Sequence, residues 1–334
     1  MKKIICVALS VLLILSMAAL TGCGAQTLKI GVGVQAVVSE VKDASADGNG
    51  SATVNETVAA VLLDESGKIV AATIDVLSYG AAFTAEGKFV PVTEFTTKRE
   101  AGDNYGMVAY AGAKKEWYEQ ADAFCALVVG KTADEVKALV ATDAKGTDEV
   151  INAGCTIYVS DFALAIDKAI ANAKECGASA KDTLKIGVNA AQGECKDAAE
   201  DANGAHKVVA DFVAVALSAD GKVTASMTDC VDASVAFDNV GKCKTEMGTI
   251  VLSKRAQRDD YGMAKYGQDL NGDGKVLEYY AQADALDAAL VGKTADEIGA
   301  VVVNGYGTED IQTAGCTIAI SGAVKAFVKA ATVA

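Results

Sequence analysis

Histidine is nearly absent from this 334-residue sequence, since His206 is the only one. The chain repeats itself, and the first copy has no counterpart of His206, so a Ser-His-Asp or Cys-His mechanism cannot be present in both copies. The spacing Cys-x-x-Cys is missing as well, which gives no indication of a zinc site or of a thioredoxin-like dithiol. The sequence therefore favours a non-enzymatic role over catalysis without deciding between them.

Basic residues are also scarce, with 30 Lys and Arg against 44 Asp and Glu and a net charge of −14. Lys2 and Lys3 belong to the N-terminal segment, so the remainder carries a net charge near −16. No basic helix or patch is visible in the sequence. An acidic chain of this kind repels the phosphates of nucleic acids, and we therefore expect no nucleic-acid partner.

Only one long apolar run occurs, and it lies at the N-terminus between Ile4 and Leu20, directly after two lysines. It ends in Leu20-Thr21-Gly22-Cys23, which resembles the lipobox of bacterial lipoproteins. This resemblance implies that residues 1–22 are a signal peptide, that Cys23 becomes lipidated, and that the chain is anchored to the cell membrane on its extracytosolic face. The alternative is an uncleaved membrane anchor, for which the apolar run is marginal in length.

Two copies of one sequence of about 150 residues follow, which we name copy one (23–175) and copy two (183–334). The matching segments occur in the same order in both copies. They are LKIGV (28 and 184), KREAGDNYGM and KRAQRDDYGM (98 and 254), EWYEQADAF and EYYAQADAL (116 and 278), VGKTADE (129 and 291), and GTDEVINAGCTI and GTEDIQTAGCTI (146 and 307). The repeat predicts two tandem domains of the same fold.

Each copy begins with short apolar segments separated by Gly-Lys turns, which predicts strands joined by hairpins. Helical spacing follows, first from Trp117 and later from Ser160 in copy one. Thr132 and Thr294 each stand three residues before a glutamate, which is typical of a helix capping box and accounts for the repeated VGKT. The pattern predicts the α+β class, with an antiparallel sheet and helices packed on one of its faces.

A segment in copy two resembles a short calcium-binding loop. Asp269, Asn271 and Asp273 are spaced as oxygen ligands, a glycine follows, and Glu278 stands at the tenth position. Copy one has a shorter segment here and lacks the pattern. We expect either a single calcium site or an Asx-Gly turn without a metal.

A repeated tyrosine precedes Gly-Met in both copies, as Tyr105 and Tyr261. A repeated Lys-Arg pair stands a few residues earlier, at Lys98 and Lys254. The tyrosines could stack on a planar ligand, and the basic pairs could meet a phosphate. The alternative is a core role for the tyrosines beside a solvated basic pair.

Gly-Cys-Thr before the last helix, with Thr156 in copy one and Thr317 in copy two, resembles the end of FMN-binding domains. The resemblance implies extracytosolic flavin-based electron transfer, with FMN attached to these threonines through a phosphoester. A phosphate before a helix start would meet free N–H groups there. In both copies, however, alanine and cysteine replace the serine and alanine of the family motif, and the upstream aspartate of the family is replaced by Val150 and Ile311.

Two hypotheses remain open at this point. In the first, the chain is an electron-carrying lipoprotein that holds flavin or another planar molecule near Thr156, Thr317, Tyr105 and Tyr261. In the second, it is a noncatalytic structural or interaction lipoprotein without a small-molecule cofactor. Such a protein could bind calcium at the loop of copy two. The mature chain also has an odd number of cysteines besides Cys23, and Cys230 could bond Cys243 if their hairpin brings them together.

Overall fold

The computed structural model describes residues 27–267 and 276–332 and confirms the α+β class, with antiparallel sheets and helices. The strands of copy one are β1 (Lys29–Lys42), β2 (Gly50–Leu63), β3 (Ile69–Phe83), β4 (Phe89–Val90) and β5 (Lys174–Glu175). Its helices are α1 (Lys98–Ala101), η1 (Gly102–Tyr105), α2 (Met107–Ala111), α3 (Trp117–Val128), α4 (Ala133–Lys137), α5 (Asp148–Ala153) and α6 (Ser160–Asn172).

Copy two has its elements in a closely similar order. Its strands are β6 (Thr183–Gln192), β7 (Gly204–Leu217), β8 (Val223–Phe237), β9 (Ile250–Val251), β10 (Val302–Val303) and β11 (Tyr306–Gly307). Its helices are α7 (Lys254–Gln257), η2 (Arg258–Tyr261), α8 (Met263–Tyr266), α9 (Tyr279–Leu290), α10 (Ala295–Gly299), α11 (Glu309–Thr313) and α12 (Ser321–Thr332). The capping boxes expected at Thr132 and Thr294 are present and begin α4 and α10.

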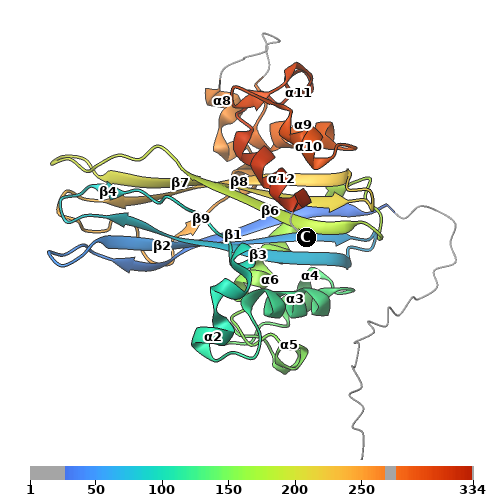
Figure 1. Ribbon diagram of the computed structural model, residues 1–334, viewed down its shortest axis with the longest axis horizontal. Coiled ribbons are helices and arrows are strands. Elements are labelled where there is room, and N and C mark those ends of the chain that lie inside the picture. The colour runs from blue at the N-terminus through green and yellow to red at the C-terminus, as the bar shows by residue number, and fades with distance from the viewer. Residues whose placement is uncertain (1–26, 268–275, 333–334) are drawn as a thin grey trace, which may run out of the picture.

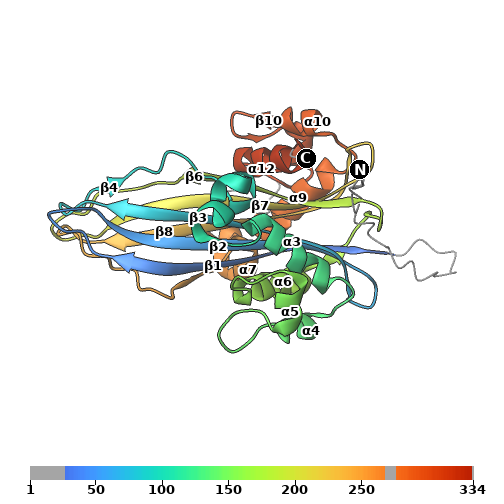
Figure 2. The same ribbon diagram turned by 60° about the horizontal axis from the view of Figure 1, so that its bottom comes forward.

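The molecule is built in four layers (Figures 1 and 2). The sheet of β1–β3 and the sheet of β6–β8 pack against each other, and the helices of each copy cover the outer face of its own sheet. The helices lie on one face of each sheet, as expected, and the opposite face is covered by the other copy. Where the helices lie, both faces of each sheet are buried, which explains why β2 and β7 end in unbroken apolar runs. The first halves of these two strands extend beyond the helices and alternate between buried and partly exposed residues.

The core between the sheets contains equivalent residues of the two copies in contact with each other. Phe83 at the end of β3 and Phe237 at the end of β8 stack with ring centroids 4.7 Å apart and ring planes 7° from parallel. Met227 of β8 lies in the same core, with its sulfur accepting from the backbone N–H of Val32. The two copies thus share the core between their sheets, and each copy has a further core of its own between its sheet and its helices.

Backbone segments also pass from one copy to the other. Strand β9 of copy two pairs with β1 of copy one, through Ala36 with Val251 and Val37 with Ile250. In the reverse direction, the carbonyl of Gly87 accepts from the N–H of Ala198. The sheet of copy one therefore includes a strand from copy two.

The repeated LKIGV segment places a glycine directly under the last helix of each copy. A Cβ on Gly31 would collide with the carbonyl oxygen of Ala169 in α6, and a Cβ on Gly187 would collide with that of Ala326 in α12. Glycine is needed here because the helix backbone rests on the strand backbone. This close approach sets the height of α6 and α12 above their sheets.

The seven cysteines between Cys125 and Cys316 are all free. Cys230 faces the helices of copy two, whereas Cys243 lies in the core between the sheets. The expected bond between Cys230 and Cys243 is therefore wrong, because the sheet separates the two side chains. Cys23 lies outside the described residues, and no helix within them has the length and apolarity to cross a membrane.

Candidate functional site

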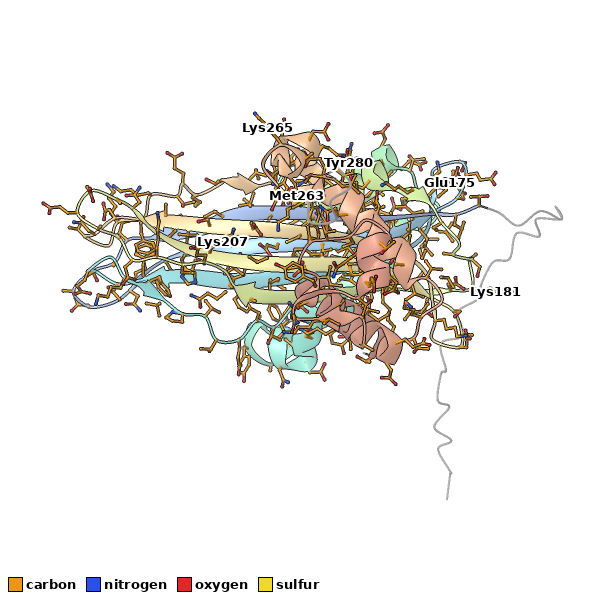
Figure 3. The ribbon with its side chains drawn as sticks, turned by 90° about the horizontal axis from the view of Figure 1, so that it is seen from above. Glu175, Lys181, Lys207, Met263, Lys265 and Tyr280 are labelled. Atoms are coloured by element: carbon orange, nitrogen blue, oxygen red, sulfur yellow. The ribbon has the colours of Figure 1, made fainter. Side chains whose placement is uncertain are left out.

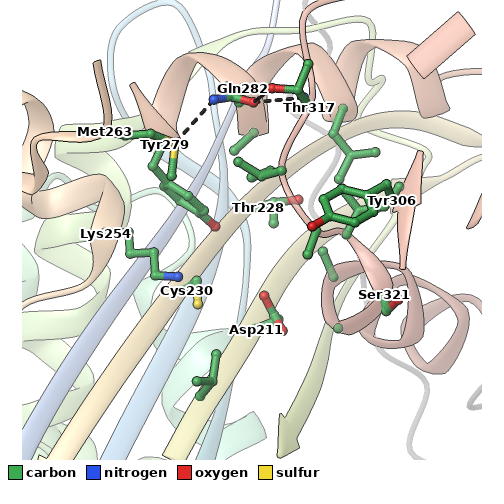
Figure 4. A pocket seen from close by; sticks show the side chains of 18 of the residues that line it. Asp211, Thr228, Cys230, Lys254, Met263, Tyr279, Gln282, Tyr306, Thr317 and Ser321 are labelled. Carbon is green, nitrogen blue, oxygen red and sulfur yellow. Dashed lines mark hydrogen bonds between the residues drawn. The ribbon is translucent and has the colours of Figure 1, made fainter. Parts of the chain in front are cut away.

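A cavity opens at the outer face of each sheet, where the start of the last helix meets the helices that follow the third strand. The cavity of copy one, about 710 Å³, is lined by Lys98, Tyr105, Met107, Trp117 and Asp161, among others. The cavity of copy two, about 610 Å³, lies at the equivalent place and shares part of this lining by position. It includes Asp211, Cys230, Lys254, Met263, Tyr279, Gln282, Tyr306 and Thr317 (Figure 4). The repeat therefore places two cavities at equivalent positions on opposite sides of the molecule.

Exposed aromatic residues gather at these cavities. Among the described residues, the exposed aromatic side chains are Tyr105, Tyr110, Tyr158 and Tyr306, with 41%, 90%, 65% and 45% of their surface accessible. The first three line the cavity of copy one, and Tyr306 lines that of copy two. Aromatic side chains left in water around a concavity are typical of ligand sites, because their rings are available to bury against a ligand.

Thr156 and Thr317 attach the loop before the last helix of their copy to another helix, which is α3 in copy one and α9 in copy two. The Oε1 atom of Gln120 in α3 accepts from the backbone N–H of Thr156 at 2.9 Å and from its hydroxyl at 3.0 Å. Gln282 in α9 binds Thr317 in the same way, at 2.8 and 3.0 Å. The repeated Gly-Cys-Thr therefore has a structural role in both copies. Both threonines remain at least partly accessible, four residues before the last helix, and Thr317 lines the cavity of copy two.

Sequence reasoning missed these two glutamines. The sequence feature that could have identified them is the Gln-Ala-Asp that both copies share in the repeated segments beginning at Glu116 and Glu278. An uncharged residue conserved between the copies at a buried helix position indicates a hydrogen-bonding role, because a buried amide needs partners. The remaining amide group of each glutamine donates to a backbone carbonyl, that of Lys115 or Leu277.

The repeated Tyr-Gly-Met begins a short helix. Gly106 and Gly262 both have φ of 78°, a left-handed conformation that favours glycine. The next two backbone N–H groups donate to a carboxylate, that of Glu116 in copy one and Glu278 in copy two, at 2.9 to 3.0 Å. Tyr105 lines its cavity, whereas Tyr261 packs edge-on against Tyr279 with centroids 6.0 Å apart.

Glu278 is one of the four residues of the expected calcium loop, and both of its carboxylate oxygens accept backbone N–H groups. The other three, Asp269, Asn271 and Asp273, lie outside the described residues. Within the ranges that the structure covers, no three His, Cys, Asp or Glu side chains are grouped to hold a metal ion. The calcium site therefore stays a prediction.

The Lys-Arg pairs are largely engaged by the protein itself. Lys254 lies over the rings of Tyr261 and Tyr279, 5.4 Å from each centroid, and forms an ion pair with Asp232 at 3.3 Å. Arg255 is 1% exposed and donates to the carbonyl of Thr228. Its guanidinium also pairs with Asp284 at 2.8 Å and lies 3.7 Å from Asp287. These contacts fix the position of the segment beside β8.

The cavities of the two copies differ in the residues at their centre. Trp117 and Phe162 meet edge to face in copy one, with centroids 5.8 Å apart. Copy two has Tyr279 and Ala323 at these positions. Thr57 and Val76 on the strands of copy one correspond to Asp211 and Cys230, which pair directly across β7 and β8. Copy two therefore has a more polar centre than copy one.

Asp211 is the charged group at this centre. Burial raises the pKa of its carboxyl to about 6, and nearby Lys254 offsets part of this effect. Burial also raises the pKa of the Cys230 thiol well above its usual range, so the thiol stays protonated and is a poor nucleophile.

A flavin phosphate on Thr317 fits this arrangement only in part. The rings of Tyr279 and Tyr306 could flank a planar group. However, the Asp211 carboxylate lies against Gly322 in the first turn of α12, where a phosphate would need free N–H groups. In copy one, Asp161 is itself the second residue of α6. A comparison with family models, with curated proteins and with solved structures gave no match for this chain.

Proposed function

We propose that this chain is a lipid-anchored, extracytosolic binding protein whose two copies each hold a small organic molecule in the cavity on their outer face. The observation that carries the proposal is the position of the exposed aromatic residues, since all four within the described residues line one of the two cavities. Three of them line the cavity of copy one and Tyr306 lines that of copy two, and exposed aromatic side chains at a concave site favour a ligand-binding role.

A binding role is supported over catalysis by what the cavities contain. His206 is fully buried in the sheet of copy two, away from both cavities, and burial lowers its pKa. The thiol of Cys230 is held protonated, as described above. The lipobox at Cys23 supports the extracytosolic location, where a binding protein tethered to the membrane would meet solutes or a partner of the same membrane.

The four methionines of the mature chain allow each cavity to be tested separately. Met107 lines the cavity of copy one and Met263 that of copy two, where Figure 3 labels it on the side of the helices. Met227 lies between the sheets, and Met247 is 71% exposed. With methyl-labelled methionine, a ligand in one cavity should shift the NMR signal of Met107 or Met263 and leave those of Met227 and Met247 unchanged.

The experiment uses the mature chain with Cys23→Ser and a panel of small aromatic and aliphatic compounds that includes FMN. Compounds that shift Met263 should lose this effect in Ala323→Phe, because Ala323 lines the cavity of copy two and the larger side chain would take up space in it. The Met107 signal of the same variant is the internal control. If no compound shifts either signal, the proposed function is wrong and a structural role without a ligand is favoured.

Flavin is the second candidate, and one observation favours it: the Thr317 side chain lines a cavity that has two tyrosine rings in its wall. In that case the chain would carry electrons at the membrane surface. Expression with a flavin transferase should add the mass of one FMN group for each modified threonine, and Thr156→Ala with Thr317→Ala should remove it. An unchanged intact mass and a colourless protein would exclude covalent flavin.

A further inference from the structure

The cavity of copy two contains a carboxylate, that of Asp211, which forms no direct ion pair with a residue that the structure describes. Lys254 is close enough to lower the pKa of this carboxyl, and Lys325 lines the same cavity. Lys254 pairs with Asp232, and Arg255 pairs with Asp284 and lies near Asp287. The thiol of Cys230 lies beside Asp211 and is also 3.8 Å from Oδ1 of Asp232, and a thiol is a weak donor. A partly buried carboxylate in this position lacks the compensation that such groups usually have.

A second group in the same cavity also lacks a partner. The side chain of Tyr279 is 4% exposed, and its hydroxyl forms no hydrogen bond with any residue that the structure describes. Figure 4 shows this hydroxyl pointing into the space above Asp211 and Cys230, with Tyr306 on the opposite side. The hydroxyl reaches the open cavity, so a ligand there can supply its hydrogen-bond partner.

The comparison of the two copies gives an independent reason to infer that the Asp211 carboxylate binds a ligand. Copy one has threonine on the strand and aspartate on the helix, as Thr57 and Asp161. Copy two has Asp211 on the strand and Gly322 on the helix, and a Cβ on Gly322 would collide with the Asp211 carboxylate. Each cavity therefore has one carboxylate beside the start of the last helix, although neither residue is conserved.

We propose that the cavity of copy two binds an organic ammonium ion, with Asp211 as its counter-ion and the Tyr279 hydroxyl as a second hydrogen-bonding group. The proposal rests on the proposed function, because it requires the cavity to be a binding site. The ammonium group fits the negative charge of Asp211, and the apolar part of the ligand would lie along Met263, Val276 and Leu286. The ring of Tyr306 faces the same space and adds a cation–π contact.

The test uses three probes of similar shape and different charge: 2-phenylethylamine, 2-phenylethanol and 3-phenylpropanoate. Binding is followed by the Met263 methyl signal of the chain with Cys23→Ser. We expect the amine to bind at least about tenfold more tightly than the alcohol, since a hydrogen-bonded charge contributes more than a neutral pair. The carboxylate probe should bind most weakly. Asp211→Asn should reduce the affinity for the amine to that for the alcohol.

Asp161→Asn is the matched control, because it removes the corresponding carboxylate of copy one and should leave the Met263 response to the amine unchanged. Asp211→Thr, which introduces the residue of copy one, repeats the test if Asp211→Asn misfolds, and the Met227 signal reports on the core between the sheets. Equal binding of amine and alcohol, tighter binding of the carboxylate probe, or an unchanged amine affinity in both Asp211 variants would overturn the ammonium proposal.

The outcomes also separate this proposal from the proposed function. If other compounds shift Met263 and the amine does not, the cavity is a binding site and the assignment of its charge is wrong. If nothing shifts Met263 or Met107, the proposed function fails, and the ammonium proposal fails with it.

Discussion

The carboxylate of Asp211 on β7 occupies the space that the side chain of residue 322 would take on α12, and Gly322 leaves this space free. The two positions therefore depend on each other. Gly322→Ala should lower the free energy of unfolding by about 1–3 kcal/mol, the usual cost of overpacking. The loss should be smaller in the double variant with Asp211→Thr, because threonine is the residue that copy one has opposite a larger helix residue. Urea unfolding of both variants measures this, and equal losses would show that the two residues are independent.

Gln282 should contribute to stability through the two hydrogen bonds that its side-chain oxygen accepts from Thr317. Gln282→Ala leaves the N–H and the hydroxyl of Thr317 without their acceptor, and we expect a loss of about 1–3 kcal/mol. Thr317→Ser keeps both donors and should cost much less. Hydrogen exchange at the Thr317 amide reports on the same bond and should become faster in Gln282→Ala. An unchanged exchange rate would contradict the role assigned to this glutamine.

Glu56 should make the stability of the protein depend on pH. It lies fully buried between the sheets, where burial raises its pKa from 4.5 to about 8 and the hydroxyl of Tyr79 donates to it at 3.1 Å. The unfolded chain loses this proton at lower pH than the folded chain, so the free energy of unfolding should fall as the pH rises from about 4.5 to about 8 and then level off.

Glu56→Gln isolates this effect, because Asp75 and Asp211, whose pKa values burial also raises, remain in both proteins. The advantage of the variant over the wild type should grow with pH by at most about 1.4 kcal/mol per unit. Urea unfolding between acidic and mildly alkaline pH measures it. Parallel stability curves for the two proteins would show that Glu56 does not titrate as described.

Calcium should bind once, at Asp269, Asn271, Asp273 and Glu278, if the loop of copy two is a metal site. Calorimetry should detect one site that Asp273→Ala removes. Glu278→Gln is a poor test variant, because Glu278 also accepts the N–H groups at the start of α8 and its loss would affect stability without calcium. No heat with millimolar calcium would exclude the site.

Cys23 should determine where the protein is found. The mature chain should begin at Cys23, carry lipid and separate with membranes. Cys23→Ala should release the protein or leave its precursor uncleaved. If the variant needs the same detergent as the wild type to be extracted from membranes, the prediction of a lipid anchor at Cys23 is wrong.

Local sequence patterns predicted several features correctly. The capping boxes at Thr132 and Thr294 begin helices because their hydrogen bonds depend only on residues three positions apart. The α+β class followed from strand patterns at the start of each copy and helical patterns after them. The packing of the two sheets was not predicted, because an apolar strand shows that both of its faces are covered and does not show by what.

Asp211 and Gln282 escaped the sequence analysis for different physical reasons. Gln282 recurs in both copies, but it was passed over because an uncharged amide carries no charge to indicate a site. Asp211 does not recur, since copy one supplies its carboxylate from α6 as Asp161. A comparison of the copies residue by residue finds side chains that stay in place, and it overlooks a group that moves from helix to strand.

Phe83 and Phe237 occupy equivalent positions in the two copies, and their rings stack on each other between the sheets. Such self-complementary contact is the signature of a two-fold symmetric dimer. A single copy made alone would expose this surface and pair with another identical chain, which would give two identical sites. When the two copies belong to one polypeptide, a substitution in one site does not change the other. The two sites of this chain differ in this way, with Trp117 and Phe162 in copy one and Tyr279 and Ala323 in copy two.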